Sequence, residues 1–194
     1  MKRLSLLALC LSAVLFASAQ KVTVKGDLKC LKDAGSVSFD FTYDNMTVGK
    51  MSEADYIEKK VTENNEKEAG KGDKWKEAWE SDKVNVFPIK FCELFTNYSK
   101  LEVSDSKQRY NILVNTDFFE PGFNIGVMRQ DACISVTIKI VDTQDGDKEL
   151  ATITILKAPG RTFSGSDYSV ADRVGEAYAK AGKEFGARVA KACK

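Results

Sequence analysis

The sequence predicts a single α+β domain, in which one mixed, largely antiparallel sheet of about five strands is packed by helices and followed by a long carboxy-terminal helix. Three patterns predict it. Three apolar runs with strand-like alternation lie between residues 110 and 157, an apolar helical stripe covers residues 86–98, and a stripe of apolar and small residues begins near Ser166. We expect the three apolar runs to form the floor on which every helix packs.

The first 19 residues have the three parts of a secretory signal peptide. Lys2 and Arg3 supply the positive start, Leu4–Phe16 the apolar run, and Ala17–Ala19 a small-residue cleavage site before Gln20. The apolar run is shorter than the roughly 20 residues that span a bilayer, and no other stretch is long enough. We therefore expect cleavage between Ala19 and Gln20, a single domain over residues 20–194, and a periplasmic or secreted protein.

Composition excludes several classes of function. Without residues 1–19 the chain keeps 27 of its 29 basic residues and all 28 acidic ones, so its net charge is close to zero and does not favour nucleic acid or an anionic membrane. The chain has no histidine, which removes the usual general base and the common metal ligand. We expect no metal and no cofactor.

Four cysteines remain after the signal peptide, at Cys30, Cys92, Cys133 and Cys193. In an exported protein they allow two disulfides in any of three pairings. The alternative is that most are small buried apolar residues, and a chain of this length does not require a disulfide to fold. We favour free, buried thiols.

Two strands are expected near the amino terminus. Val22–Cys30 alternates weakly, with Gly26 marking a bulge, and Ser36–Tyr43 alternates cleanly. Because the turn at residues 32–35 lies between them, we expect the two strands to pair as a hairpin. In the second strand we expect one apolar face: Val37, Phe39, Phe41 and Tyr43.

Residues 52–83 predict a charged helical excursion. Ser52 suits a helix cap, and 17 of the 31 residues from Glu53 to Lys83 are charged. Glycines at residues 70 and 72 divide the segment into two short helices. Trp75 and Trp79 lie four residues apart, so they either attach the excursion to the body or face a partner.

The centre of the chain predicts one helix and three strands. The helix is Val86–Tyr98, with Pro88 in its first turn, where a missing N–H costs nothing. The strands have many β-branched residues, which favour a half-buried sheet. The side chains expected to face the core are Ile112, Val114, Thr116, Phe118, Ile134, Val136, Ile138, Ile140, Ala151, Ile153 and Ile155.

The last helix carries glycines at 175, 182 and 186 beside its apolar stripe. Each costs about 1 kcal/mol relative to alanine, so we expect close approach to the sheet or to another helix. A dimer through the small-residue face is the alternative. The preceding loop, residues 160–167, has the glycine spacing of a phosphate loop, but Ser166 replaces the lysine, so we expect Ser166 or Asp167 only to cap the helix.

The candidate binding site lies after the first central strand. Pro121 and Gly122 suit a type II turn, and the segment that follows is more apolar than most loops. We favour a loop folded onto the core as an extra edge strand, because large exposed apolar patches are uncommon. The alternative is a recognition surface. The candidate residues are Phe119, Phe123, Ile125, Val127 and Met128, with Trp75 and Trp79 second.

A resemblance to known proteins rests on four segments: Tyr110-Asn-Ile-Leu-Val, Glu120-Pro-Gly-Phe-Asn-Ile-Gly-Val-Met128, Ala158-Pro-Gly-Arg161 and Arg173-Val-Gly-Glu-Ala-Tyr-Ala-Lys-Ala-Gly-Lys183. They resemble uncharacterised exported proteins of Bacteroidetes over about the last 85 residues. The arrangement is distantly similar to periplasmic α/β domains of the TolB amino-terminal and curli secretion lipoprotein type. Neither resemblance implies catalytic residues.

We therefore predict a non-enzymatic binding or assembly module for a protein or envelope component. The alternative is a hydrolase that acts on envelope carbohydrate through paired carboxylates, for which Asp117 and Glu120 are the candidates. The sequence does not indicate the ligand or the oligomeric state.

Overall fold

The computed structural model describes residues 20–125, 127–161 and 169–194, so the predicted signal peptide and most of the predicted capping loop lie outside the described residues. The strands are β1 (Lys21–Gly26), β2 (Ser36–Thr42), β3 (Thr47–Val48), β4 (Met51–Ser52), β5 (Glu102–Val103), β6 (Tyr110–Glu120), β7 (Phe123–Asn124), β8 (Arg129–Gln130), β9 (Ala132–Asp142) and β10 (Lys148–Gly160). The helices are α1 (Glu53–Asn65), α2 (Lys71–Asn85), α3 (Phe87–Ser99) and α4 (Val170–Ala192), with a short 3-10 turn, η1, at Leu28–Leu31.

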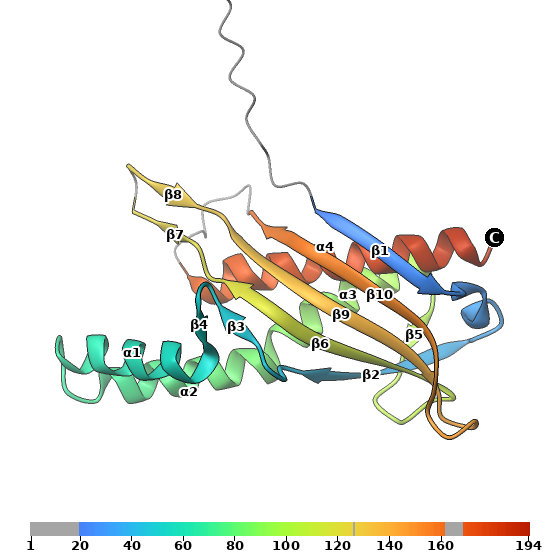
Figure 1. The fold of residues 1–194 in the computed structure, drawn as a ribbon, viewed down its shortest axis with the longest axis horizontal. Coiled ribbons are helices and arrows are strands. Elements are labelled where there is room, and N and C mark those ends of the chain that lie inside the picture. Colours follow the sequence, from blue (N-terminus) through green and yellow to red (C-terminus); the bar gives the residue numbers. More distant parts are fainter. Residues whose placement is uncertain (1–19, 126, 162–168) are drawn as a thin grey trace, which may run out of the picture.

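One mixed sheet forms the body, in the order β1-β10-β9-β6-β2-β5, with β3 paired to β6 and β4 to β3. Helices α3 and α4 lie side by side on one face of this sheet, and α1 and α2 extend from its end as a helical pair (Figure 1). The predicted fold class is confirmed, with more strands than expected because short pairs such as β3 and β4 carry no alternation of their own.

The three predicted central strands are confirmed as neighbours, and both of their pairings are antiparallel. The alternation of β9 and β10 also holds, since their predicted inward residues are buried. The prediction for Phe118 is wrong: a bulge between Thr116 and Phe118 shifts the strand by one residue, and Phe119 is the buried side chain.

The predicted amino-terminal hairpin is wrong. Strand β1 pairs with β10 antiparallel, whereas β2 pairs with β6 in parallel on the opposite side of the sheet. Val22 and Val24 lie opposite Ile155 and Ile153, so β1 extends an apolar ladder that β2 does not adjoin. After Gly26, at φ +87°, the chain enters η1 and crosses to the far edge.

The helices begin and end close to their predicted bounds. Ser52 caps α1, since its hydroxyl accepts a hydrogen bond from the Asp55 amide (3.1 Å). Gly70, at φ +80°, starts α2, and Pro88 lies in the first turn of α3. Helix α4 begins at Val170 with Ser169 as its cap, whereas the predicted caps Ser166 and Asp167 lie outside the described residues.

The small residues of α4 lie against α3. An added Cβ at Gly182 would overlap the Phe91 carbonyl oxygen, and one at Gly186 would come within 2.7 Å of the Phe95 carbonyl oxygen. The predicted close approach is therefore to another helix of the same chain, and this face of α4 is covered by α3. Tighter packing across the seam offsets the low helix propensity of glycine.

This seam predicts opposite effects for two glycine substitutions in the same helix. At Gly182 a methyl group has no space against the Phe91 backbone, so Gly182→Ala should destabilise the protein by about 2 kcal/mol, as overpacking does. At Gly175 the nearest atom, Lys90 Cγ, would lie at an ordinary 3.6 Å, so Gly175→Ala should be neutral or stabilise by up to about 1 kcal/mol. Urea unfolding measures both. Equal stabilities would show that α4 is not seated on α3 as described.

Candidate functional site

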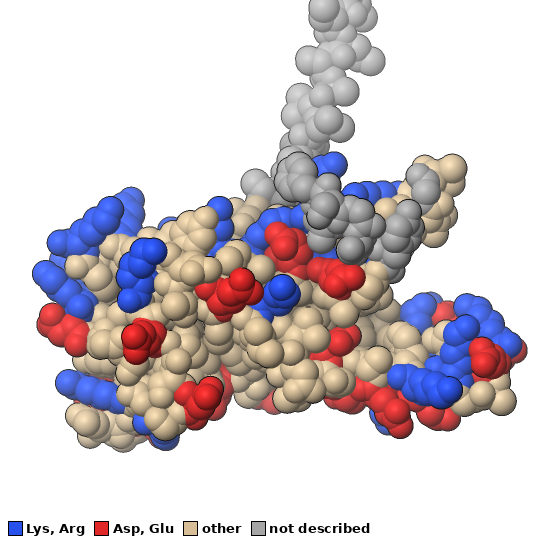
Figure 2. Space-filling view, turned by 180° about the vertical axis from the view of Figure 1, so that it is seen from behind, with Lys and Arg blue, Asp and Glu red and all other residues tan. Residues whose placement is uncertain are grey.

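A short apolar hairpin projects beyond the ends of β6 and β9 (Figure 1). Its strands β7 and β8 pair only with each other, and its tip is closed by a hydrogen bond from the Ile125 amide to the Met128 carbonyl oxygen (3.0 Å). The exposed fractions of its apolar side chains are 37% for Phe123, 65% for Ile125, 91% for Val127 and 59% for Met128. We call these four residues the apolar tip. In Figure 2 the tip is an outward projection that carries no charged residue at its end.

The favoured sequence interpretation of this loop, a segment folded onto the core, is wrong. An extra strand pair does form, but the pair forms within the loop and does not join the main sheet. The β6–β9 ladder ends at Glu120 and Cys133, and the turn at Gly122, with φ +60°, then directs the chain outward. An added Cβ at Gly122 would overlap the Gln130 carbonyl oxygen, so glycine is required there.

Arg173 supports the base of the hairpin from the first turns of α4. Its guanidinium is buried, and it donates from Nε to the Pro121 carbonyl oxygen (3.1 Å) and from Nη2 to the Gly122 carbonyl oxygen (3.3 Å). The Gly122 amide in turn donates to Glu120 Oε1 (3.1 Å). Sequence reasoning missed this role, although an arginine between Val170 and Val174, on the buried side of a helix, was a usable signal.

The other three candidate residues lie in or against the core. The ring of Trp79 lies 4.9 Å from that of Phe119 and 5.4 Å from that of Trp75, and its Nε1 donates to Glu53 Oε1 (2.7 Å). Trp79 and Phe119 are buried, and Trp75 is half-buried. These side chains attach α2 to the sheet and offer a partner little surface, whereas three of the four residues of the apolar tip are mostly exposed.

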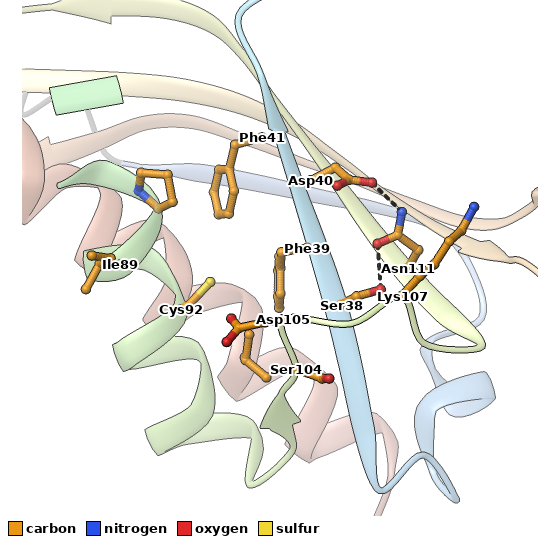
Figure 3. Close-up of a pocket in the computed structure, with 12 residues that line it drawn as sticks. Ser38, Phe39, Asp40, Phe41, Ile89, Cys92, Ser104, Asp105, Lys107 and Asn111 are labelled. Atoms are coloured by element: carbon orange, nitrogen blue, oxygen red, sulfur yellow. Dashed lines mark hydrogen bonds between the residues drawn. The ribbon is translucent and has the colours of Figure 1, made fainter. Parts of the chain in front are cut away.

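A second feature is a groove of about 480 Å³ between the edge of β2 and the start of α3 (Figure 3). Phe39 and Phe41 of β2 face α3 across it, and the segment after β5 closes its far end. The lining residues are Ser38, Phe39, Asp40, Phe41, Pro88, Ile89, Cys92, Val103, Ser104, Asp105, Lys107 and Asn111. We call this the β2 groove.

Three of the six polar residues that line the β2 groove are bonded to one another. Asn111 donates to Asp40 Oδ2 (2.6 Å) and accepts from the Ser38 hydroxyl (2.8 Å). Burial raises the pKa of the Cys92 thiol to about 12, which leaves almost no thiolate at neutral pH. The groove therefore provides recognition groups and no activated nucleophile.

The acids considered for hydrolysis have structural partners. Asp117 accepts hydrogen bonds from Asn115 Nδ2 (2.8 Å) and from the Thr137 hydroxyl (2.7 Å), and Glu120 accepts from the Gly122 amide. Neither acid lines the β2 groove.

The four cysteines of residues 20–194 are free thiols in the structure, as expected, but each is half-buried and none is fully buried as the favoured interpretation had it. Burial is the main cause that raises the pKa of all four. Within residues 20–125, 127–161 and 169–194, no group of acidic or cysteine side chains is placed to hold a metal ion. In the same ranges, no helix has the length and apolar character needed to span a bilayer.

No protein-family model and no curated protein matches the sequence. Solved structures with a similar arrangement include two PelC dodecamers from Paraburkholderia phytofirmans, each covering 90% of this chain and 97% of its own. One, a point variant, is 9% identical with a TM-score of 0.42, and the other is 11% identical with a TM-score of 0.44. A DUF330 protein from Xanthomonas campestris is 11% identical, covers 83% of this chain and 86% of its own, and has a TM-score of 0.41. These values describe a loose likeness of fold, and no residue role is taken from them.

The raised pKa of Cys92 predicts its reactivity. A thiol with a pKa of about 12 has roughly one thiolate in 10⁴ at pH 8, whereas an ordinary cysteine has about a quarter. Brief treatment of the native protein with iodoacetamide at pH 8 should leave Cys92 unmodified, and the denatured protein should be labelled at all four sites. From pH 8 to pH 9 the slow native rate at Cys92 should rise about tenfold, since its titration lies above this range. Peptide mass spectrometry checks both, and rapid native labelling at Cys92 would contradict its burial.

Proposed function

We propose that this chain is an exported binding module that captures a protein or another envelope component through the apolar tip. The observation that supports it is the exposure of four apolar side chains on a hairpin whose base is fixed to the body by Arg173. The signal peptide predicted at residues 1–19 supports the proposal of export.

The energetics of the tip favour contact with a partner. Each Å² of apolar surface removed from water stabilises by about 25 cal/mol. Ile125, Val127 and Met128 are still exposed at 59–91%, so most of this stabilisation is reached only when a partner covers them. An isolated two-stranded hairpin is marginally stable in water, and this one is supported at its base rather than at its tip. Phenylalanine and methionine are also enriched in protein interfaces.

Binding is better supported than hydrolysis. A glycosidase needs two carboxyl groups that flank the bond to be cleaved. Here Asp117 and Glu120 accept hydrogen bonds from different structural groups, and no observation on the described residues favours the hydrolase alternative.

A matched pair of valines tests the role of the tip. Val127 on the tip and Val84 on α2 are both exposed, at 91% and 70%. Val127→Ser should weaken retention of the partner from envelope extract at least fivefold, as loss of an interface anchor does, whereas Val84→Ser should not. Both variants should keep the melting temperature within about 2 °C, because surface substitutions change stability by about 0.5 kcal/mol or less.

Photocrosslinking gives the second measurement. A benzoylphenylalanine at position 127 should give a discrete adduct in envelope extract, and one at position 84 should not. Equal retention by the two serine variants, or the same adducts from both positions, would show that the tip is not the contact surface. A large fall in melting temperature for Val127→Ser alone would show instead that the tip belongs to the core.

A further inference from the structure

The edge of β2 that faces away from β6 is paired over only part of its length. Strand β5 covers it at Ser36 and Val37, where the Glu102 amide donates to the Gly35 carbonyl oxygen (3.3 Å) and the Ser104 amide to the Val37 carbonyl oxygen (2.9 Å). The pairing with β5 ends at Val37. The rest of β2 has β6 as its one neighbouring strand within the described residues.

The pairing with β5 shows which backbone groups face this edge. In a strand, the N–H and C=O of one residue point to the same side and those of the next residue to the opposite side. The backbone carbonyl groups of Gly35 and Val37 point toward β5. The backbone N–H and C=O groups of Phe39 and Phe41 therefore point toward the same edge, beyond the end of β5. Their backbone donors and acceptors therefore open into the β2 groove, and β5 has already shown that this edge accepts a parallel strand.

The two outer edges of the sheet differ in their protection. Strand β1 carries Lys21 and Lys25, the type of residue that keeps exposed edges from pairing with other chains. Strand β2 has the sequence SVSFDFT, with no lysine and no proline, and its pairing with β6 has no bulge. Its one charged residue is Asp40, so the less protected edge is the one that lies beside a groove.

The groove adds side-chain recognition to this open edge. Its α3 wall offers Pro88 and Ile89, and the Ile89 side chain is 61% exposed. Asp40 and Asp105 line it as well (Figure 3). The one cation of the lining is Lys107, whose Nζ lies 3.6 Å from Asp147 Oδ1. A strand beside β2 would place its side chains alternately on the two faces of the sheet. An apolar side chain toward Ile89 and, on the other face, a cationic side chain toward Asp40 would match the groove in polarity and charge.

We propose that the β2 groove binds an extended segment of a partner protein, which adds to the sheet as a strand beside Phe39 and Phe41. Main-chain hydrogen bonds supply the affinity, and alternate side chains supply the selection of apolar and basic residues. The segment continues the edge where β5 ends. This site lies on the body of the domain and does not depend on the apolar tip.

A synthetic peptide tests the proposal directly. The probe is a fluorescent peptide of about nine residues in which lysine and valine alternate, titrated with the whole chain and followed by anisotropy. We expect saturable binding. Two further peptides carry N-methyl groups on one or the other alternate set of backbone nitrogens. Because only one set faces β2, one methylated peptide should bind like the parent and the other at least about tenfold more weakly. Equal binding by both, or no binding at about 1 mM, would overturn the proposal.

Protein variants separate the groove from general attraction of a basic peptide. Ile89→Asp replaces the exposed apolar side chain of the α3 wall with a charged one. It should weaken peptide binding at least about tenfold, although the new carboxylate adds attraction for the lysines of the peptide. Asp105→Asn should weaken it about threefold and reduce its salt dependence. Val127→Ser should leave it unchanged. If Ile89→Asp binds more tightly, the peptide is held by charge alone and the proposal fails.

Amide hydrogen exchange locates the added strand. In the free protein the amides of Phe39 and Phe41 should exchange much faster than those of Ser38 and Asp40, which face β6. The peptide should slow the first pair at least about tenfold and leave the second pair unchanged. Slow exchange of Phe39 and Phe41 without peptide, in a protein that light scattering shows to be dimeric, would assign the edge to a second copy and overturn the proposal.

Discussion

The backbone contact between α4 and α3 is the constraint on which the rest of the structure depends. Gly182 and Gly186 let α4 approach the Phe91 and Phe95 carbonyl groups so closely that no side chain fits between the helices. This approach brings the ring of Phe185 to 5.0 Å from that of Phe95, and the ring of Tyr178 stacks on Phe87 at 4.9 Å. On its other side α3 carries Phe91 against Phe41 of β2. Helix α3 therefore joins the last helix to the far edge of the sheet, and one aromatic layer closes the core.

The apolar tip and the open part of β2 lie outside this aromatic layer. The apolar tip continues from β6 and β9 after their ladder has ended, and it is fixed at its base by Arg173 of α4 rather than by packing at its end. The open part of β2 remains because β5 pairs with only two of its residues. Arg173 and Gly182 belong to the same helix, so the element that closes the core also positions the tip. The two proposed contact sites use different chemistry, since the tip offers side chains and the edge of β2 offers backbone groups.

The sequence predicts those features of the fold that depend on local periodicity. The burial of Ile138 and Ile153, the cap at Ser52 and the close seat of the last helix all follow from residue spacing. Prediction from the sequence fails where a strand can pair with several strands that are distant in the chain. Alternation in β1 shows that a strand exists, but its pairing with β10 depends on which strand of the folded sheet still has an unpaired edge. The short turn before β2 wrongly favours a hairpin. The bulge that exchanges Phe118 for Phe119 leaves no signal in composition.

The same reasoning explains the candidate site. The apolar content of residues 123–128 is visible in the sequence, but their exposure depends on where the β6–β9 ladder ends. The β2 groove is invisible in the sequence, because it requires β5 to stop after two residues.

Amide hydrogen exchange in low concentrations of denaturant tests most directly whether the core closes without the apolar tip. The amides of Ile138 and Ile153, in the middle of the sheet, should exchange only through global unfolding, with a strong dependence on denaturant. The amides of Ile125 and Val127 should exchange through local opening, several orders of magnitude faster and almost independently of denaturant. If the tip amides show the same free energy of exchange and the same denaturant dependence as the sheet, the hairpin is part of the core, and the account of a closed body with a free contact surface is wrong.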